Sequence, residues 1–118
     1  MKINIDQLVL GFDGTTPVED VPGTPLTVRK VIENGINLQD ERNLLTAEQK
    51  IKAFRIGVRL NTKKRPEYNF TVDEAAFIKE RVGIYYSPVV YGRLLELLGD
   101  EKVQLPEDEP EPQATPAA

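Results

Sequence analysis

Positive charge is concentrated in the middle of this 118-residue chain. Residues 46–65 contain seven basic side chains and one acidic side chain. The basic residues are Lys50, Lys52, Arg55, Arg59, Lys63, Lys64 and Arg65. Cations on a helix and its following loop can neutralise phosphates, and Tyr68 and Phe70 follow closely enough to stack on bases. The alternative is a solvated charged face, the usual role of a charge run on an amphipathic helix.

Tyrosines form a second group with possible binding chemistry. Tyr85, Tyr86 and Tyr91 lie within seven positions of one another. Tyrosine is common in interfaces, and it is equally common at the edge of a core, where its hydroxyl stays in water. We expect Tyr91 at the core edge and one of Tyr85 and Tyr86 exposed, where it can contact a partner.

The carboxylates fit structural roles better than catalysis. Asp73, Glu74 and Glu80 could act as acids and bases or hold magnesium, but the first two stand where a helix N-terminus favours negative charge. Asp13 precedes Gly14 in a typical turn sequence and is expected to stabilise that turn.

The residue types that are missing exclude most catalytic chemistry. The chain has no histidine, cysteine or tryptophan, which removes Ser/His/Asp and Cys/His triads, Cys/His zinc sites and thiol redox chemistry. We therefore expect a protein that is not an enzyme and uses no metal or cofactor. The absence of cysteine, of a long apolar run and of a signal-peptide pattern predicts a cytoplasmic protein that does not enter a membrane.

Two helices are predicted around the basic residues. Thr27 is a plausible N-cap for a helix over 28–38 with an apolar face of Val28, Val31, Ile32 and Ile36. Thr46 and Gln49 form a capping box for a helix over 47–60. The expected buried stripe of this second helix comprises Ala47, Ile51, Phe54 and Val58. That orientation would leave Lys50, Lys52, Arg55 and Arg59 facing water or a partner.

Two more helices follow a loop at 61–66. Thr71 and Glu74 repeat the capping box, and Gly83 is expected to end or loosen this third helix. Its apolar stripe is Ala75, Ile78 and Val82. Ser87 and Pro88 begin a fourth helix that Gly99 closes. The fourth helix is the most apolar, with Val90, Tyr91, Leu94, Leu95 and Leu98, and is expected at the centre of the core.

The ends of the chain have different compositions. Ile3 and Ile5 alternate with polar residues, and Asp13-Gly14 predicts a β-hairpin that packs on the helices, with a possible partner strand at 67–70. Residues 100–118 contain six acidic residues and several prolines, which predicts a disordered tail that promotes solubility or contacts the basic segment. The expected fold is α+β and mainly helical, with one folded domain over 1–99 and a disordered acidic tail over 100–118.

Three stretches of the sequence carry a resemblance to a known group. They are PLTVRKVI at 25–32, FIKERVG at 77–83 and YSPVV at 86–90. With these stretches, residues 2–98 resemble small accessory proteins of tailed bacteriophages and prophages. The matching positions are helix caps and core residues, so the resemblance implies a fold and assigns no activity, catalytic residue or binding residue.

These observations predict a non-enzymatic function. We expect a phage or prophage accessory protein in the bacterial host cytoplasm that binds a phage or host protein, as an assembly factor or a modulator of a host component. The alternative is a nucleic-acid-binding module that uses residues 50–65. The candidate partner-binding residues are Lys50, Lys52, Arg55, Arg59, Lys63, Lys64, Arg65, Tyr68, Tyr85 and Tyr86. The sequence leaves the oligomeric state open.

Overall fold

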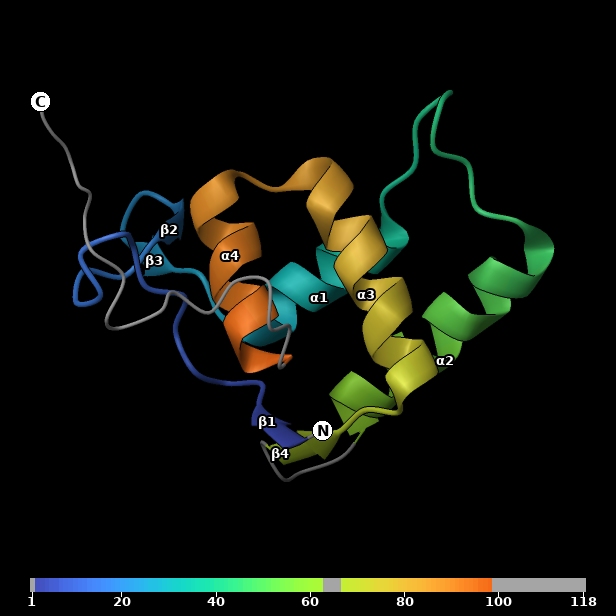
Figure 1. Ribbon diagram of the computed structural model, residues 1–118, viewed down its shortest axis with the longest axis horizontal. Coiled ribbons are helices and arrows are strands. Elements are labelled where there is room, and N and C mark those ends of the chain that lie inside the picture. The colour runs from blue at the N-terminus through green and yellow to red at the C-terminus, as the bar shows by residue number, and fades with distance from the viewer. Residues whose placement is uncertain (1, 63–66, 99–118) are drawn as a thin grey trace, which may run out of the picture.

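The predicted α+β class is confirmed by the computed structural model, which describes residues 2–62 and 67–98 (Figure 1). The helices in this part of the chain are α1 (Val28–Asn37), α2 (Ala47–Thr62), α3 (Val72–Tyr85) and α4 (Pro88–Leu97). The strands are β1 (Lys2–Asn4), β2 (Glu19–Val21), β3 (Thr24–Pro25) and β4 (Glu67–Asn69). Their buried apolar side chains form one continuous core. The predicted tail at 100–118 and the predicted helix end at Gly99 lie outside the described residues.

Local capping determines where the helices begin. The Thr27 hydroxyl accepts a hydrogen bond from the Lys30 amide, as expected of an N-cap. Both capping boxes form, because Thr46 and Gln49 exchange reciprocal hydrogen bonds and Thr71 and Glu74 do the same. Ser87 occupies the N-cap of α4 with Pro88 after it, although the Ser87 side chain makes no capping hydrogen bond. The four predicted helix starts are therefore confirmed.

The centre of the core is the contact between α1 and α3, the most extensive packing between two helices in the described residues. Val31, Ile32 and Ile36 of α1 are buried, as are Ile78 and Val82 of α3. Gly35 allows the close approach, since a Cβ atom there would lie 2.5 Å from Cγ2 of Val82. The prediction that α4 is central was wrong in this respect, although Val90, Leu94, Leu95 and Leu98 are buried as expected.

Gly83 does not end α3, because the helix continues to Tyr85. A Cβ atom at Gly83 would lie 3.1 Å from the ring of Tyr91, so the glycine gives Tyr91 room to pack on α3. Tyr91 is half-buried against the core, which confirms its predicted place at the core edge. Tertiary packing thus explains a glycine that local propensity treats as a helix breaker.

The orientation of α2 is opposite to the predicted one. Ile56 and Leu60 are buried, whereas Ile51, Phe54 and Val58 of the predicted stripe are exposed. Ala47 is exposed as well. The inward face has Lys52 and Arg59 beside it, and both pair with carboxylates at the start of α3. Turning Phe54 inward would expose Ile56 and Leu60 and separate these ion pairs.

The N-terminal strands differ in detail from the predicted hairpin. The hairpin joins β2 to β3 through Gly23, whose φ of 86° suits glycine. Asp13-Gly14 also reverses the chain, and an isolated β-bridge between Leu10 and Pro17 closes this turn. β1 pairs antiparallel with β4, placing Ile3 opposite Tyr68, so the predicted strand at 67–70 is confirmed. Residues 61 and 62 of the expected loop at 61–66 belong to α2, which continues to Thr62, and residues 63–66 lie outside the described residues.

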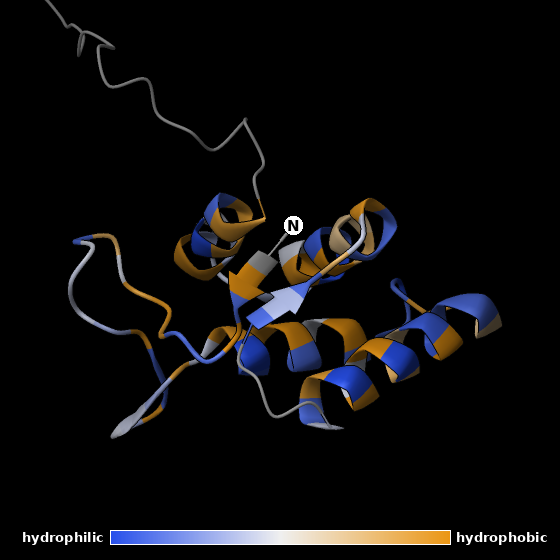
Figure 2. Cartoon of the chain, turned by 90° about the horizontal axis from the view of Figure 1, so that it is seen from below, coloured by the Kyte–Doolittle hydropathy of each residue, from blue (hydrophilic) through white to orange (hydrophobic). Residues whose placement is uncertain are grey.

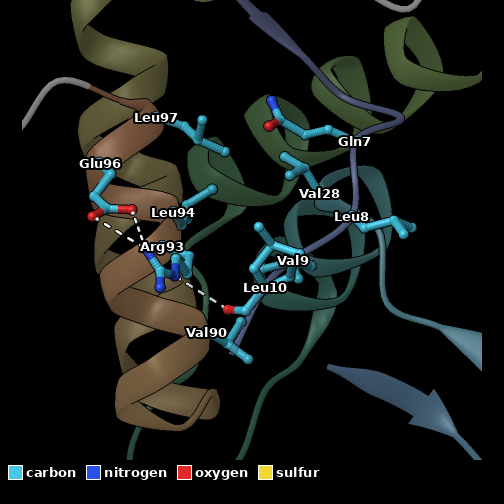
Figure 3. Close-up of a pocket in the computed structure, with 11 residues that line it drawn as sticks. Gln7, Leu8, Val9, Leu10, Val28, Val90, Arg93, Leu94, Glu96 and Leu97 are labelled. Atoms are coloured by element: carbon cyan, nitrogen blue, oxygen red, sulfur yellow. Dashed lines mark hydrogen bonds and ion pairs between the residues drawn. The ribbon is translucent and has the colours of Figure 1, made fainter. Parts of the chain in front are cut away.

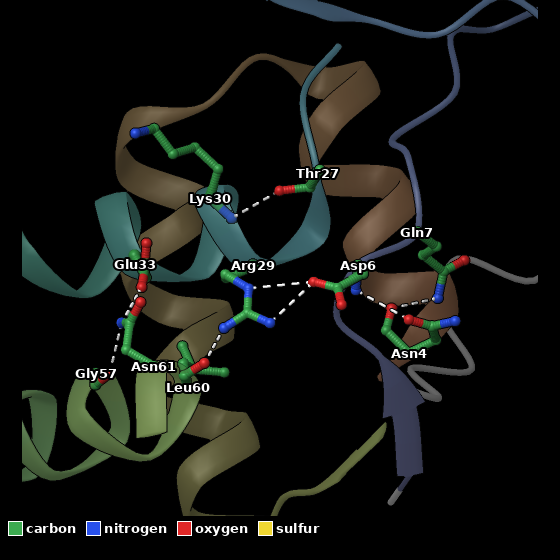
Figure 4. A network of polar contacts seen from close by, with 10 residues as sticks. All are labelled: Asn4, Asp6, Gln7, Thr27, Arg29, Lys30, Glu33, Gly57, Leu60 and Asn61. Carbon is green, nitrogen blue, oxygen red and sulfur yellow. Dashed lines mark hydrogen bonds and ion pairs between the residues drawn. The ribbon is translucent and has the colours of Figure 1, made fainter. Parts of the chain in front are cut away.

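Arginine side chains fasten loops to this framework. Arg29 of α1 binds the Asp6 carboxylate and donates to the Leu60 carbonyl at the end of α2 (Figure 4). Arg81 is 4% exposed and donates to the carbonyls of Leu38 and Asn43, at 2.7 and 2.8 Å. Arg93 binds the carbonyls of Leu10 and Gly11. Each guanidinium satisfies backbone acceptors that lie far away in the sequence.

Candidate protein interface

The basic residues predicted as one cluster have different surroundings. The Lys52 ammonium lies 2.7 Å from the Asp73 carboxylate and 5.4 Å from the centre of the Phe77 ring. Arg59 lies 2.6 Å from the Glu74 carboxylate and 5.6 Å from the centre of the Tyr68 ring. These two cations therefore connect α2 to α3 and β4, and their charges are already neutralised within the protein.

Lys50 and Arg55 are the exposed members of the cluster on α2. Within 2–62 and 67–98, neither side chain has a hydrogen bond or an ion pair, so both charges are available to a partner. Lys63, Lys64 and Arg65 lie outside the described residues. The described part of the basic segment thus offers two available cations to a ligand.

The aromatic residues predicted beside the cluster do not form a stacking platform. Tyr68 and Phe70 are each 2% exposed and stack on one another with ring centres 5.6 Å apart. Burial raises the pKa of Tyr68, against the opposing effect of the Arg59 charge. A base cannot reach either ring, so the prediction that Tyr68 contacts a partner was wrong.

Tyr85 and Tyr86 are both half-buried, and the expectation that one of them is exposed was wrong. The Tyr86 hydroxyl accepts a hydrogen bond of 3.1 Å from the Asn34 side chain, and burial raises the pKa of Tyr86. The Tyr85 ring lies 5.7 Å from the Arg81 guanidinium. The Tyr86 hydrogen bond therefore connects α1 to the end of α3, whereas Tyr85 contacts Arg81 within α3.

An exposed apolar surface on α2 is the main feature that the sequence analysis assigned wrongly. Its exposed fractions are 53% for Ile51, 71% for Phe54 and 41% for Val58. We call these residues, together with the exposed Ala47, the α2 strip. Figure 2 shows hydrophobic residues recurring along α2 at the outer edge of the molecule. A row of large apolar side chains in water is typical of a binding surface.

A groove beside the strip separates α2 from α1. Its volume is about 860 Å³, and its walls include Phe54, Val58 and Lys50 from α2 and Glu33 from α1. Asn61 at its end donates to the Glu33 carboxylate and to the Gly57 carbonyl (Figure 4). A second hollow on the other side of the strip is lined by Ile51, Arg55 and the start of α3. The strip is therefore a ridge with a groove along each side.

The hollow between α4 and the N-terminal segment has a different character. It is small, about 120 Å³, and lined mainly by aliphatic side chains such as Val9, Val90 and Leu94 (Figure 3). Its polar members are occupied, because Arg93 pairs with Glu96 at 3.1 Å and also binds the Leu10 carbonyl. This hollow is a small gap in the packing between α4 and the N-terminal segment.

The predicted structural roles of the carboxylates are confirmed. Glu74 closes a capping box, and Asp13 accepts hydrogen bonds from the Thr15 and Thr16 amides and the Thr16 hydroxyl. In the described ranges no three acidic side chains gather in a way that could hold a metal ion. No helix in those ranges is both long and apolar enough to cross a membrane.

The stability of the turn held by the Asp13 carboxylate is expected to depend on pH. Its hydrogen bonds from the Thr16 side chain and the Thr16 and Thr15 amides lower its pKa from 3.8 to about 2. Because the folded pKa is depressed, the carboxylate stabilises the turn above pH 3.8, and this stabilisation is lost as the pH falls through about 2. An NMR titration of the Asp13 carboxyl carbon should show this low midpoint, and Thr16→Val should raise it. A midpoint near 3.8 in the unchanged protein would contradict the observed turn.

Comparison of the chain with protein-family models, with curated proteins and with solved structures gave no match. The exposed surface of the molecule and the pattern of its sequence are therefore the features that indicate a function.

Proposed function

We propose that this protein is a non-enzymatic accessory protein of a tailed phage or prophage that acts by binding another protein, as an assembly factor or a modulator of a host component. The observation that carries the binding function is the α2 strip, whose large apolar side chains face solvent. The phage or prophage origin is supported by the resemblance of residues 2–98 to accessory proteins of that group.

The strip fits a protein partner better than a nucleic acid. Burial of Phe54, Ile51 and Val58 would remove apolar area from water, which is the main driving force of protein association. A phosphate backbone would instead need several available cations. Lys52 and Arg59 are paired with carboxylates, and Tyr68 and Phe70 are buried.

A capture experiment tests the proposal with a matched pair of variants. Phe54→Glu places a charge on the strip, and Phe12→Glu makes the same change at an exposed phenylalanine in the N-terminal segment, away from α2. Each tagged protein is exposed to a lysate of the bacterial host, with and without nuclease, at low and moderate salt. We expect the unchanged protein and Phe12→Glu to capture a protein regardless of nuclease and salt, and Phe54→Glu to lose it. Capture that nuclease abolishes would contradict the proposal.

The nucleic-acid alternative is tested separately. Deleting residues 101–118 removes the acidic segment that would compete for the cations. Full-length and truncated proteins are titrated into labelled DNA and RNA at two salt concentrations. We expect weak binding from both. Strong, salt-dependent binding by the truncated protein, lost in Lys50→Glu and Arg55→Glu, would establish the alternative instead.

A further inference from the structure

The spacing of the α2 strip identifies the kind of partner surface that would cover it. Its members occupy positions 47, 51, 54 and 58 of the helix, so the steps are four, three and four residues. This is the spacing of the a and d positions in a heptad repeat, which packs against a second helix. Ile51 and Val58 take the a positions, and Ala47 and Phe54 take the d positions.

The rest of α2 agrees with this assignment. The b, c and f positions of the repeat lie on the opposite side of the helix, and they include the buried Ile56 and Leu60 and the paired Lys52 and Arg59. One side of α2 therefore packs on the protein's own core. The other side presents a heptad seam, about two repeats long, that no described residue covers.

The charges beside the seam decide whether a partner helix packs parallel or antiparallel to α2. Glu48 and Arg55 are exposed at e positions, and Lys50 is exposed at a g position. Glu48 and Arg55 are seven residues apart, about 10 Å along the helix, so they cannot pair within one copy. Among the described residues neither side chain has an ion pair.

A second copy of this chain fits these charges in one orientation only. In a parallel pair of helices, g positions face e positions, which would put Lys50 of one copy against Arg55 of the other. In an antiparallel pair, e positions face e positions, and Glu48 of each copy meets Arg55 of the other. Because a two-fold axis relates the two copies, this ion pair occurs twice in the dimer.

We infer that a second copy of this chain covers the α2 strip, with the two α2 helices packed antiparallel about a two-fold axis. This inference depends on the proposed function, since both assign the α2 strip to protein binding, and the second copy occupies the strip when the captured partner is absent. In this arrangement Ala47 of one copy lies beside Val58 of the other, and Ile51 lies beside Phe54. The contact is short, so the dimer forms reversibly with protein concentration.

Sedimentation over a wide range of protein concentrations tests the dimer. The unchanged protein and Phe12→Glu should show a monomer–dimer equilibrium, and Phe54→Glu should remain a monomer with unchanged circular dichroism. Phe54 is 71% exposed, so this substitution leaves the core intact. A protein that stays monomeric at every concentration, or a dimer that Phe54→Glu does not affect, would overturn the inference.

Charge reversal tests the orientation. Arg55→Glu alone places Glu48 against a glutamate in both symmetric pairs and should weaken dimerisation roughly tenfold or more. Glu48→Arg alone should weaken it similarly, because it places two arginines together. Combining the two substitutions restores opposite charges and should recover the original affinity. Failure of the double variant to recover would overturn the antiparallel arrangement.

Disulfide cross-linking measures the relative orientation of the two α2 helices independently. The natural chain has no cysteine, so only the introduced cysteines can react. Ala47→Cys and Val58→Cys proteins should form a disulfide with each other when mixed and oxidised, and form few disulfides separately. Efficient cross-linking within each separate variant would instead indicate parallel helices. If the protein is a monomer but still captures another protein through Phe54, the inference fails while the proposed function stands.

Discussion

Replacing Leu94 with alanine is expected to cost about 2–5 kcal/mol of unfolding free energy, the range for a buried leucine in a packed core. Leu94 is 2% exposed and lies on the face of α4 that packs on the core and on the N-terminal segment (Figure 3). Truncation would enlarge the hollow that already lies beside it, and the surrounding helices can close this space only in part. Denaturant unfolding of the purified protein measures the change.

Leu38→Ala is the matched control for this prediction. Leu38 is 43% exposed at the end of α1, so the same truncation should cost about 1 kcal/mol or less. The control keeps the Leu38 carbonyl, which accepts a hydrogen bond from Arg81. A loss below about 1 kcal/mol for Leu94→Ala would show that α4 contributes little to the core.

Gly35→Ala is expected to destabilise the protein by about 1–3 kcal/mol, although alanine is the better helix former by about 1 kcal/mol. The added Cβ would lie 2.5 Å from Cγ2 of Val82 and 3.2 Å from its Cα. A side chain can change rotamer, but the Val82 backbone belongs to α3 and can move only with that helix. The substitution therefore forces α1 and α3 apart at the centre of the core.

Gly92→Ala is expected to have the opposite effect on the stability of the protein. Gly92 lies inside α4, and a Cβ there would meet no atom within 4 Å. Replacing it should stabilise the protein by up to about 1 kcal/mol through helix propensity. The two glycine variants should thus shift the unfolding midpoint in opposite directions. Equal stabilisation by both would contradict the close contact of α1 with α3.

Features that depend on near neighbours in the chain could be predicted from the sequence alone. The N-caps at Thr27, Thr46 and Thr71 form as predicted, because each capping hydrogen bond joins residues three positions apart. The Asp13 turn forms for the same reason. The identity of the apolar residues also predicted four helices and the burial of Leu94.

The candidate interface could be predicted only in part. Lys50 and Arg55 were identified from the sequence as available cations, and the structure leaves them exposed. The apolar strip between them was assigned to the core, and Tyr68 was assigned to the surface. Both errors concern the direction in which a side chain points. The helix and the strand that carry these side chains were predicted correctly.

The side of α2 that faces inward depends on tertiary contacts and could not be predicted from the sequence. The helix has two apolar rows on opposite sides, one with Phe54 and one with Ile56 and Leu60, and the larger row suggests the wrong orientation. The orientation found satisfies Lys52 and Arg59 with carboxylates on α3 and buries Ile56 and Leu60 in the core. Periodicity within one helix contains no information on these distant groups, since packing energy depends on neighbours that the fold brings together.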